Sequence, residues 1–503
     1  MTRTLPRTEQ LPYALYRAAQ VRELDRIAIE EFGIPGETLM ERAGAAAFAR
    51  LRERWPDVRD VTVLAGQGNN GGDGYVLARH ARALGLAVRV LQAGDAARVR
   101  GDAARQRARF VEAGGELGSL DALPARTDVI VDGLFGTGLD RAPAGEWARA
   151  IEAANAHPAP VLALDVPSGL EADTGRALGP AIRAALTVTF VALKQGLFTG
   201  EGPDHCGQIV FEGLELPAAI YARQLLAARR IDWGRFGAAL APRDRSASKG
   251  RFGHVLVIGG DLGMAGAARL AGEAALRAGA GLVSVATRPG HAEALAAVRP
   301  ELMAHGIDTA ADLAPLMERA TVVAIGPGLG RGDWGRALWG AALGSGRPLV
   351  VDADALFRLA QAPLRREDWV LTPHPGEAAR LLQAEIAVIQ ADRPAAAAAL
   401  QQRYGGIVVL KGAGTIVQGG GTRPPAVCSA GNPGMATGGT GDVLCGLVAA
   451  LIAQGHAPED AAELGVCLHA AAGDAAARAG ERGLIASDLF PPLRGLLNPE
   501  PRR

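Results

Sequence analysis

The chain contains little lysine and little cysteine. Lysine occurs only at Lys194, Lys249 and Lys411, and the other 50 of the 53 basic residues are arginine. Each lysine lies in a glycine-flanked segment. We interpret these lysines as positions in tight sites, where a compact ammonium group fits and the larger guanidinium group of arginine does not. Chance is the alternative. No pair of cysteines has C-x-x-C spacing, which disfavours a disulfide framework or a cysteine-based zinc site and fits a reducing compartment. The four cysteines are Cys206, Cys428, Cys445 and Cys467.

The chain also lacks a net charge and a long apolar run. Lys+Arg and Asp+Glu each number 53, which excludes a broadly basic surface, so we expect no nucleic-acid partner. The longest apolar run, 443–453, is well short of the roughly 20 residues that a membrane-spanning helix needs. The first 20 residues have no apolar signal core. We therefore expect a cytoplasmic protein that does not associate with membranes.

The 503 residues alternate short apolar strands with segments of helical periodicity. Near-continuous apolar strands separated by helices predict a parallel sheet that is covered on both faces. Residues 214–248 carry no comparable strand, so we expect two domains, 1–225 and 226–503. The fold class is α/β, with a Rossmann-like doubly wound sheet in the first domain. The expected strands are 61–66, 87–94, 128–136, 160–169 and 186–193, followed by 254–260, 281–287, 321–328, 348–355, 369–377 and 406–414.

Glycines and polar residues follow the first expected strand. Gly66, Gly68 and Gly71 form a G-x-G-x-x-G turn before a helix, which alone is a weak dinucleotide fingerprint. A dehydrogenase should have an acidic residue at the end of the next strand, but that strand ends near Gln92. The same turn also carries Asn69, Asn70 and Asp73. A hydride-transfer enzyme is therefore disfavoured, and a plain glycine turn that opens a helix remains an alternative.

Two further loops reach the same edge of the sheet, because parallel strands end there together. Asp132 ends the third strand, and Asp165 and Ser168 follow the fourth. Carboxylate and hydroxyl oxygens suit a hard cation, and a helix N-terminus suits phosphate. A helix cap or turn is the alternative for either aspartate alone.

The first half resembles the YjeF N-terminal family of NAD(P)H-hydrate epimerases over about residues 20–216. The motifs that carry this resemblance are LMERAG (39–44), AGQGNNGGDG (65–74), DGLFGTGLDR (132–141), LDVPSGLEADTG (164–175) and TFVALKQGLFTGEG (189–202). The resemblance implies a K⁺ ion held by Asn70, Asp132 and Ser168. It implies substrate contacts from Asn69, Asn70, Gly71, Gly72, Asp73, Gly136, Thr137, Gly138, Leu139, Asp140, Arg141, Ala142 and Asp165. Asp132 and Asp165 are the candidate catalytic residues, with their acid and base roles left open.

A glycine-rich segment, 427–446, precedes an apolar helix in the second half. Backbone N–H groups in such a turn form an anion hole, and the helix dipole reinforces it. Asp442 within this hole is expected to act as a general base beside a phosphoryl group. The alternative is an N-cap of a helix that begins at Val443. No Walker-type G-x-x-x-x-G-K-[ST] sequence is present.

The second half is similar to the ribokinase-like superfamily and, within it, to ADP-dependent NAD(P)H-hydrate dehydratases, over about residues 235–495. The carrying motifs are AIGPGLG (324–330), VVDADAL (350–356), LTPHPGE (371–377), VLKGAGT (409–415), GNPGMATGGTGDVLCG (431–446) and GLIASDL (483–489). The similarity implies that the hydrate contacts Ala267, Gly328, His374 and Asp442. It implies nucleotide binding by Lys411, Gly412, Ala413, Gly414, Thr415 and Gly441, with ADP as co-substrate and Mg²⁺. The family's S-H-K-G near the domain start is here Ser246–Gly250 without histidine, so this segment receives no role.

Together the two resemblances imply a bifunctional enzyme that repairs hydrated NADH and NADPH. The first half epimerises the R and S forms, and the second dehydrates the S form with release of AMP and phosphate. We expect a homo-oligomer that acts on small molecules. The rival interpretation is a ribokinase-like small-molecule kinase with a non-catalytic nucleotide-binding module at its N-terminus.

Overall fold

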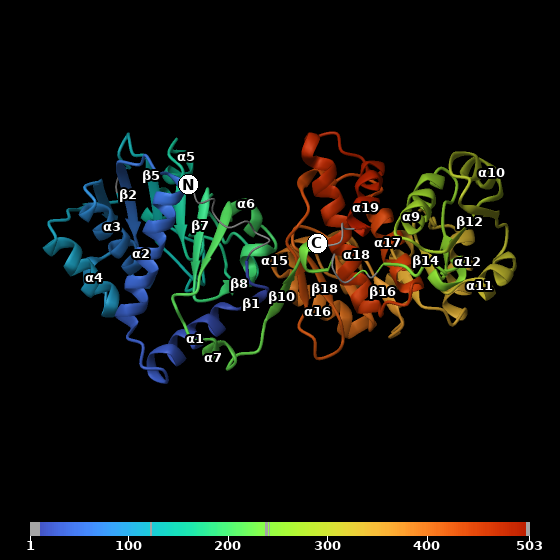
Figure 1. The fold of residues 1–503 in the computed structure, drawn as a ribbon, viewed down its shortest axis with the longest axis horizontal. Helices are drawn as coiled ribbons and strands as arrows, with labels where there is room; N and C mark the ends of the chain where they lie inside the picture. The colour runs from blue at the N-terminus through green and yellow to red at the C-terminus, as the bar shows by residue number, and fades with distance from the viewer. Residues whose placement is uncertain (1–10, 121–122, 237–239, 241, 499–503) are drawn as a thin grey trace. The chain divides into compact units, whose positions relative to one another are not determined.

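The computed structural model describes residues 11–120, 123–236, 240 and 242–498 (Figure 1). The chain divides into two compact units, Met1–Arg230 and Ile231–Arg503. Each unit is built on its own sheet and is described by itself below. A mixed α/β protein with two parallel-sheet bodies, as the sequence predicts, is thereby confirmed.

The sheet of the N-terminal unit has the order β4-β3-β2-β5-β6-β7-β9, and every pairing in it is parallel. This order reverses direction between β2 and β5, as in a doubly wound fold. The strands are β2 (Asp60–Ala65), β3 (Ala87–Gln92), β4 (Leu117–Ser119), β5 (Val129–Gly133), β6 (Val161–Leu164), β7 (Leu186–Phe190) and β9 (Gln208–Glu212). The helices are α1 (Ala18–Glu30), α2 (Gly36–Arg54), α3 (Asn69–Ala83), α4 (Gly101–Glu112), α5 (Glu146–Ala156), α6 (Gly202–Cys206) and α7 (Ala218–Tyr221).

This sheet is buried on both faces, because its side chains alternate between two separate apolar clusters. Val63 and Val131 belong to one cluster, and their strand neighbours Leu64 and Ile130 belong to the other. Near-continuous apolar strands are therefore needed, and this is the pattern that made them recognisable in the sequence.

A group of short strands outside the seven-stranded sheet was not expected. β10 (Ala228–Ile231) lies within 214–248, where the sequence predicts no strand, and this expectation was wrong. It pairs antiparallel with β1 (Ala14–Tyr16), which pairs parallel with β8 (Leu193–Lys194). Two adjacent arginines interrupt the apolar character of β10, so its strand state depends on pairing with a segment more than 200 residues away.

The sheet of the C-terminal unit has the order β13-β12-β11-β14-β15-β16-β17-β18-β19. It is parallel through β17 and ends in antiparallel pairings of β18 and β19. The strands are β11 (His254–Ile258), β12 (Leu282–Thr287), β13 (Met303–Gly306), β14 (Val322–Ile325), β15 (Leu349–Val351), β16 (Trp369–Leu371), β17 (Ile407–Leu410), β18 (Thr415–Gln418) and β19 (Ala426–Cys428). The helices are α8 (Trp233–Phe236), α9 (Ala265–Arg277), α10 (Pro289–Val298), α11 (Ala314–Arg319), α12 (Asp333–Gly344), α13 (Ala353–Gln361), α14 (Pro375–Leu382), α15 (Ile386–Ala391), α16 (Arg393–Tyr404), α17 (Thr440–Ala453), α18 (Pro458–Ala476) and α19 (Phe490–Leu497).

Helix α17 packs closely against α9 in the C-terminal unit. A Cβ atom on Gly446 would lie 2.0 Å from the carbonyl oxygen of Ala271, so only glycine permits this approach. The buried apolar residues of α17 join the core on the sheet, which places the glycine-rich segment before α17 at the sheet edge. In the part of the chain that the structure describes, no helix is both long and apolar enough to span a bilayer.

Candidate active sites

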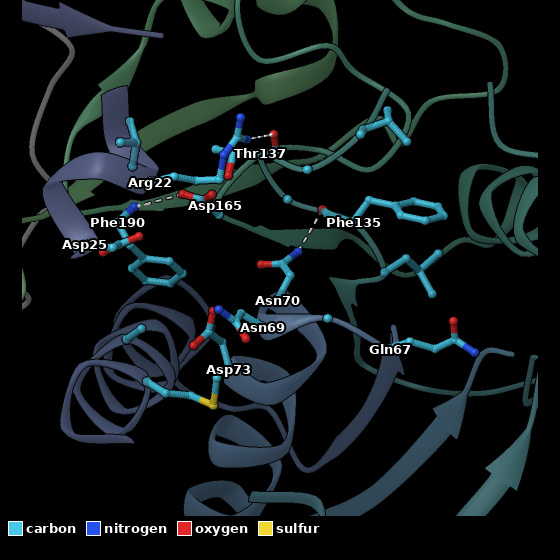
Figure 2. A pocket seen from close by; sticks show the side chains of 18 of the residues that line it. Arg22, Asp25, Gln67, Asn69, Asn70, Asp73, Phe135, Thr137, Asp165 and Phe190 are labelled. Carbon is cyan, nitrogen blue, oxygen red and sulfur yellow. Dashed lines mark hydrogen bonds between the residues drawn. The ribbon is translucent and has the colours of Figure 1, made fainter. Parts of the chain in front are cut away.

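A cavity of about 770 Å³ lies at the carboxyl ends of β2, β5 and β6 in the N-terminal unit (Figure 2). The first turn of α3, the loop after β5 and residues of α1 contribute polar side chains to its wall. Parallel strands bring these loops to one edge, as the sequence predicts.

An oxygen-rich group lies next to this cavity. Ser168 donates from Oγ to Oδ1 of Asp132 at 2.6 Å, and its backbone N–H donates to Oδ2 at 2.8 Å. Asn70 donates through Nδ2 to the carbonyl of Phe135 at 2.8 Å. Its Oδ1 is buried and, within the described residues, lacks a hydrogen-bond partner. A buried oxygen acceptor without a hydrogen-bond donor destabilises the folded protein. A cation that binds oxygen ligands in a flexible geometry would compensate for the missing donor.

The expected residues of the N-terminal site fall into two groups. Asn69, Asn70, Asp73, all residues from Gly136 to Ala142, and Asp165 line the cavity. Gly71, Gly72, Asp132 and Ser168 do not line it. A Cβ on Gly71 would lie 2.1 Å from the carbonyl oxygen of Gly66, so this glycine allows the turn to close. Burial raises the pKa of Asp132 to about 6, although its hydrogen bonds from Ser168 and Leu134 lower it.

Asp165 is held in a fixed position by Lys194. The ammonium group of Lys194 pairs with Oδ1 of Asp165 and also donates to Thr189 Oγ1 (3.1 Å) and to the carbonyl of Phe190 (2.7 Å). Lys194 is fully buried. Asp165 and Val191 both have φ of 65°, which is unusual for residues with a side chain and especially for a β-branched one. Strained backbone of this kind concentrates at functional sites.

Two more carboxyl groups, Asp25 and Asp73, reach the cavity from α1 and α3 (Figure 2). Burial raises the pKa of Asp25 to about 6, with Lys194 lowering it and Asp165 raising it. Burial and the charges of Asp165 and Asp25 raise the pKa of Asp73 well above its usual range. Sequence reasoning missed Asp25, because it lies among the charged residues of an amphipathic helix and in no motif.

The structure also bears on the dehydrogenase alternative. Gln92, at the end of β3, accepts hydrogen bonds from Tyr75 (3.1 Å) and Arg107 (2.6 Å). Dinucleotide-binding folds carry an acidic residue that binds the ribose at this position. Here the position is occupied by the amide of Gln92, which is bonded to other side chains of the protein.

In the C-terminal unit, charged side chains converge near the first turn of α17. Lys411 Nζ lies 2.8 Å from Asp352 Oδ1 and 3.8 Å from Glu377 Oε2. Burial lowers the pKa of Lys411, but the charges of Asp352 and Glu377 outweigh it and the pKa is raised. A Cβ on Gly441 would lie 3.2 Å from Lys411 Nζ, so the glycine lets the ammonium group approach the helix.

Asp442 lies in the first turn of α17 and not at its N-cap. The helix begins at Thr440 and Gly439 is the N-cap, so the alternative of an N-cap aspartate is wrong. Burial raises the pKa of Asp442 to about 7, and the charge of Asp352 adds to this while Lys411 opposes it. A carboxyl group of this pKa can exchange a proton near neutrality.

The other expected residues lie on neighbouring loops of this edge. His374 caps α14, where its Nδ1 accepts from Gly376, and it lines a cavity of about 270 Å³ with Asp354 and Glu377. A Cβ on Gly328 would lie 3.3 Å from Cβ of Ala267, so these two positions adjoin. Gly412, Ala413 and Gly414 form the loop between β17 and β18, and Thr415 begins β18.

Asp352 and Arg393 are among the residues of this site to which the sequence motifs gave no role. Asp352 belongs to a quoted motif, but its pairing with Lys411 joins strands 59 residues apart. The buried guanidinium of Arg393 donates to the carbonyls of Leu410, Lys411 and Gly414 and so supports the expected nucleotide loop. Over the described ranges, no three His, Cys, Asp or Glu residues form a ready-made metal site.

Comparisons with known proteins match both units. The family model described as YjeF-related protein N-terminus matches residues 36–196, and the model described as NAD(P)H-hydrate dehydratase matches residues 255–493. A Coxiella burnetii protein named bifunctional NAD(P)H-hydrate repair enzyme Nnr is 49% identical over 96% of this chain and 99% of its own. The Escherichia coli protein of the same name is 46% identical over 97% and 95%. A ribokinase-like superfamily protein from Enterococcus faecalis superposes with a TM-score of 0.51 at 29% identity, covering 55% of this chain and 97% of that one.

Proposed function

The chain belongs to the family of bifunctional NAD(P)H-hydrate repair enzymes, with an epimerase part in its N-terminal unit and a dehydratase part in its C-terminal unit, and on this premise we propose the roles of its residues. The substrates are small molecules, hydrated NADH and NADPH. The rival kinase with a non-catalytic N-terminal module does not fit this family membership.

The epimerase site takes the hydrated nicotinamide into the N-terminal cavity. Asn69, Asn70, Asp73, the loop from Gly136 to Ala142, and Asp165 contact the substrate, and Gly71 and Gly72 shape the turn that carries them. Asn70, Asp132 and Ser168 hold a K⁺ ion, which supplies positive charge next to the substrate. The unpartnered Oδ1 of Asn70 supports this assignment. Because Asp132 does not line the cavity, we assign it to the cation and Asp165 to the proton transfer.

The dehydratase site uses ADP as the phosphoryl donor. The loop from Lys411 to Thr415 and Gly441 bind the nucleotide, while Ala267, Gly328, His374 and Asp442 contact the hydrate. Mg²⁺, which prefers phosphate oxygens with one or two carboxylates, offsets the charge of the phosphoryl group when bound. Asp352 and Glu377, whose carboxylates both lie within 4 Å of Lys411 Nζ, offer oxygen donors of the right kind.

Asp442 removes the proton from the hydroxyl group of the S hydrate. The hydroxyl oxygen then attacks the terminal phosphorus of ADP, and AMP leaves. The phosphorylated oxygen departs as phosphate while the adjacent ring carbon loses a proton, which restores the double bond of NAD(P)H. The N–H groups at the start of α17 face the transferred group, in keeping with phosphate binding at helix N-termini.

The observation that carries this proposal is the raised pKa of Asp442, about 7, at a glycine-rich helix start beside Lys411. It is tested with an epimer mixture of hydrated NADH, ADP, Mg²⁺ and K⁺, by following the absorbance of reduced nicotinamide. We expect full recovery of NADH. Recovery that stops when the S form is used up would contradict the epimerase, and a stable phosphorylated product would indicate a kinase.

The preference for ADP, the homo-oligomeric state and the cytoplasmic location remain predictions. Parallel assays with ADP and ATP test the first. Light scattering coupled to chromatography tests the second, and cell fractionation tests the third.

A further inference from the structure

Two carboxyl groups in the N-terminal cavity lack a partner. Asp73 is 9% exposed, yet within the described ranges neither its side chain nor that of Asp25 makes a hydrogen bond or an ion pair. Both line the same cavity as Asp165 (Figure 2). A buried carboxyl group without partners is costly to ionise, so burial favours the protonated form of both groups.

The ammonium group of Lys194 has no N–H left to form an ion pair with Asp25 or Asp73. Lys194 has three N–H donors, and all three have acceptors: Asp165, Thr189 and the carbonyl of Phe190. Among the described residues, Lys194 is the cation that lowers the pKa values of both Asp25 and Asp73. Asp165 has the direct contact with it, and Asp25 and Asp73 do not.

The charges that raise or lower the pKa values of Asp25 and Asp73 come from three sources. Lys194 lowers both values, Asp165 raises both, and Asp25 raises that of Asp73. Arg22 donates to the carbonyl of Thr137 at 3.1 Å and Asp102 pairs with Arg105, so both are engaged elsewhere. The other charged side chains that line the cavity are Arg98, Asp140 and Arg141, while α2 contributes Leu39, Met40 and Ala43.

We propose that Asp73 is the general acid of the epimerase, opposite Asp165 as the base, and that Asp25 is a positioning residue that keeps the proton on Asp73. This deepens, and rests on, the proposed epimerase function. The division follows the contacts: the carboxylate paired with an ammonium accepts a proton, and the unpaired buried carboxyl group delivers one.

The step balances without water. Asp165 takes the proton of the hydroxyl group, the bond from the hydrated carbon to the ring nitrogen breaks, and its electron pair moves to the nitrogen. Asp73 gives its proton to that nitrogen, and the former hydrated carbon becomes an aldehyde. The aldehyde group turns, the nitrogen attacks its other face, and both protons return. This route avoids a ring cation, which could lose a proton and become NAD(P)H within the wrong site.

The experiment separates the R and S hydrates of NADH by chromatography and follows their interconversion by the full-length protein without nucleotide. D73N should lower kcat by about 10²- to 10⁴-fold with KM within about threefold, because a general acid acts in the transition state. Hydrogen-exchange protection of β2 and β5 that matches the parent protein controls for folding of the N-terminal unit. An interconversion rate of D73N within threefold of the parent rate would overturn the proposal.

A second variant tests the positioning role. The rate falls as pH rises through the pKa of the acid, and the negative charge of Asp25 raises that pKa. D25N should therefore move the alkaline limb of kcat/KM to lower pH, and D25E should restore it. An equal loss at every pH, with no shift of the limb, would show that Asp25 is merely structural. If the parent protein fails to interconvert the epimers, the proposed epimerase function itself is wrong.

Discussion

The ammonium nitrogen of Lys411 lies 2.8 Å from Oδ1 of Asp352, and the carboxylate is 2% exposed. The pair joins the end of β17 to the residue after β15 and leaves room for the first turn of α17. Lys194 forms a similar pair with Asp165 in the other unit. Two of the three lysines thus lie in tight sites, as their retention predicts, whereas Lys249 is exposed.

Replacing Lys411 by Arg should impair the dehydratase. A guanidinium group is larger than an ammonium group, and the Cβ position of Gly441 is only 3.2 Å from Nζ. We expect the KM for ADP to rise at least about tenfold, since charge-assisted contacts contribute roughly 1.5–3 kcal/mol each. K249R, at the exposed lysine, is the matched control and should match the parent protein. Equal kinetics of K411R and K249R would contradict a tight site at Lys411.

The dehydratase should lose activity as pH falls through about 7. Asp442 must be ionised to accept a proton, and its pKa is raised from 3.8 to about 7, chiefly by burial. Below that pH the carboxyl group is protonated and cannot act as the base. The measurement is kcat/KM for the S hydrate between pH 5 and 9. A rate that stays constant down to pH 5 would exclude this carboxyl group as the base.

D442N should lower dehydratase kcat by about 10²- to 10⁴-fold, the usual contribution of a general base. Epimerisation by the same protein should be unchanged, because it takes place in the other unit. Hydrogen-exchange protection of α17 that matches the parent protein would show that the C-terminal unit is folded, and a D442N protein with the parent's kcat would contradict the role of Asp442.

Lys194→Met should destabilise the N-terminal unit. It leaves the carboxylate of Asp165, 15% exposed, without its cation. Removal of one partner from a buried ion pair costs about 3–5 kcal/mol. The measurement is hydrogen-exchange protection of β6 and β7, with K249M as control. The double variant K194M/D165N should recover part of the loss, and a K194M protein as protected as the parent would refute the pairing.

Gly446→Ala should destabilise the C-terminal unit and reduce dehydratase activity. Its Cβ would lie 2.0 Å from the backbone oxygen of Ala271, so α17 and α9 must separate, at about 1–3 kcal/mol. Gly340 is an exposed glycine inside α12 with no atom near its Cβ position. G340A should therefore stabilise by about 0.5–1 kcal/mol. Thermal unfolding of both variants checks the contrast.

The sequence alone predicted those strands that can be recognised from their own run of apolar residues. Each of the eleven expected ranges contains a strand, because a doubly buried parallel strand must be apolar at nearly every position. The ranges 348–355 and 369–377 were too long, since Ala353 begins α13 and Pro375 begins α14. The expected loops meet at the sheet edges for the same topological reason. β10 was missed because it depends on β1, a partner far away in the chain. β18 and β19 were also missed, although each pairs with the strand just before it.

The site residues also divide into those that a motif identifies and those that only the folded structure reveals. Motifs located Asp165 and Asp442, because glycine-rich loops and strand-end acids can be recognised in the chain. They did not locate Asp25 or the role of Asp352, whose significance comes from side chains that approach from other elements. The residue roles stay predictions that these variants test, and the domain boundary at 225/226 stays a prediction.

The small number of lysines makes selective chemical labelling of this protein feasible. Lys194 is fully buried and the side chain of Lys411 is 19% exposed within its ion pair, so Lys249 is the lysine that an amine-directed label can readily reach. Apart from a label on the α-amino group, a fluorophore or tether introduced with such a reagent would therefore report from one known lysine at the start of the C-terminal unit. Protection of Lys411 from slow labelling by added nucleotide would then provide a binding assay that needs no turnover.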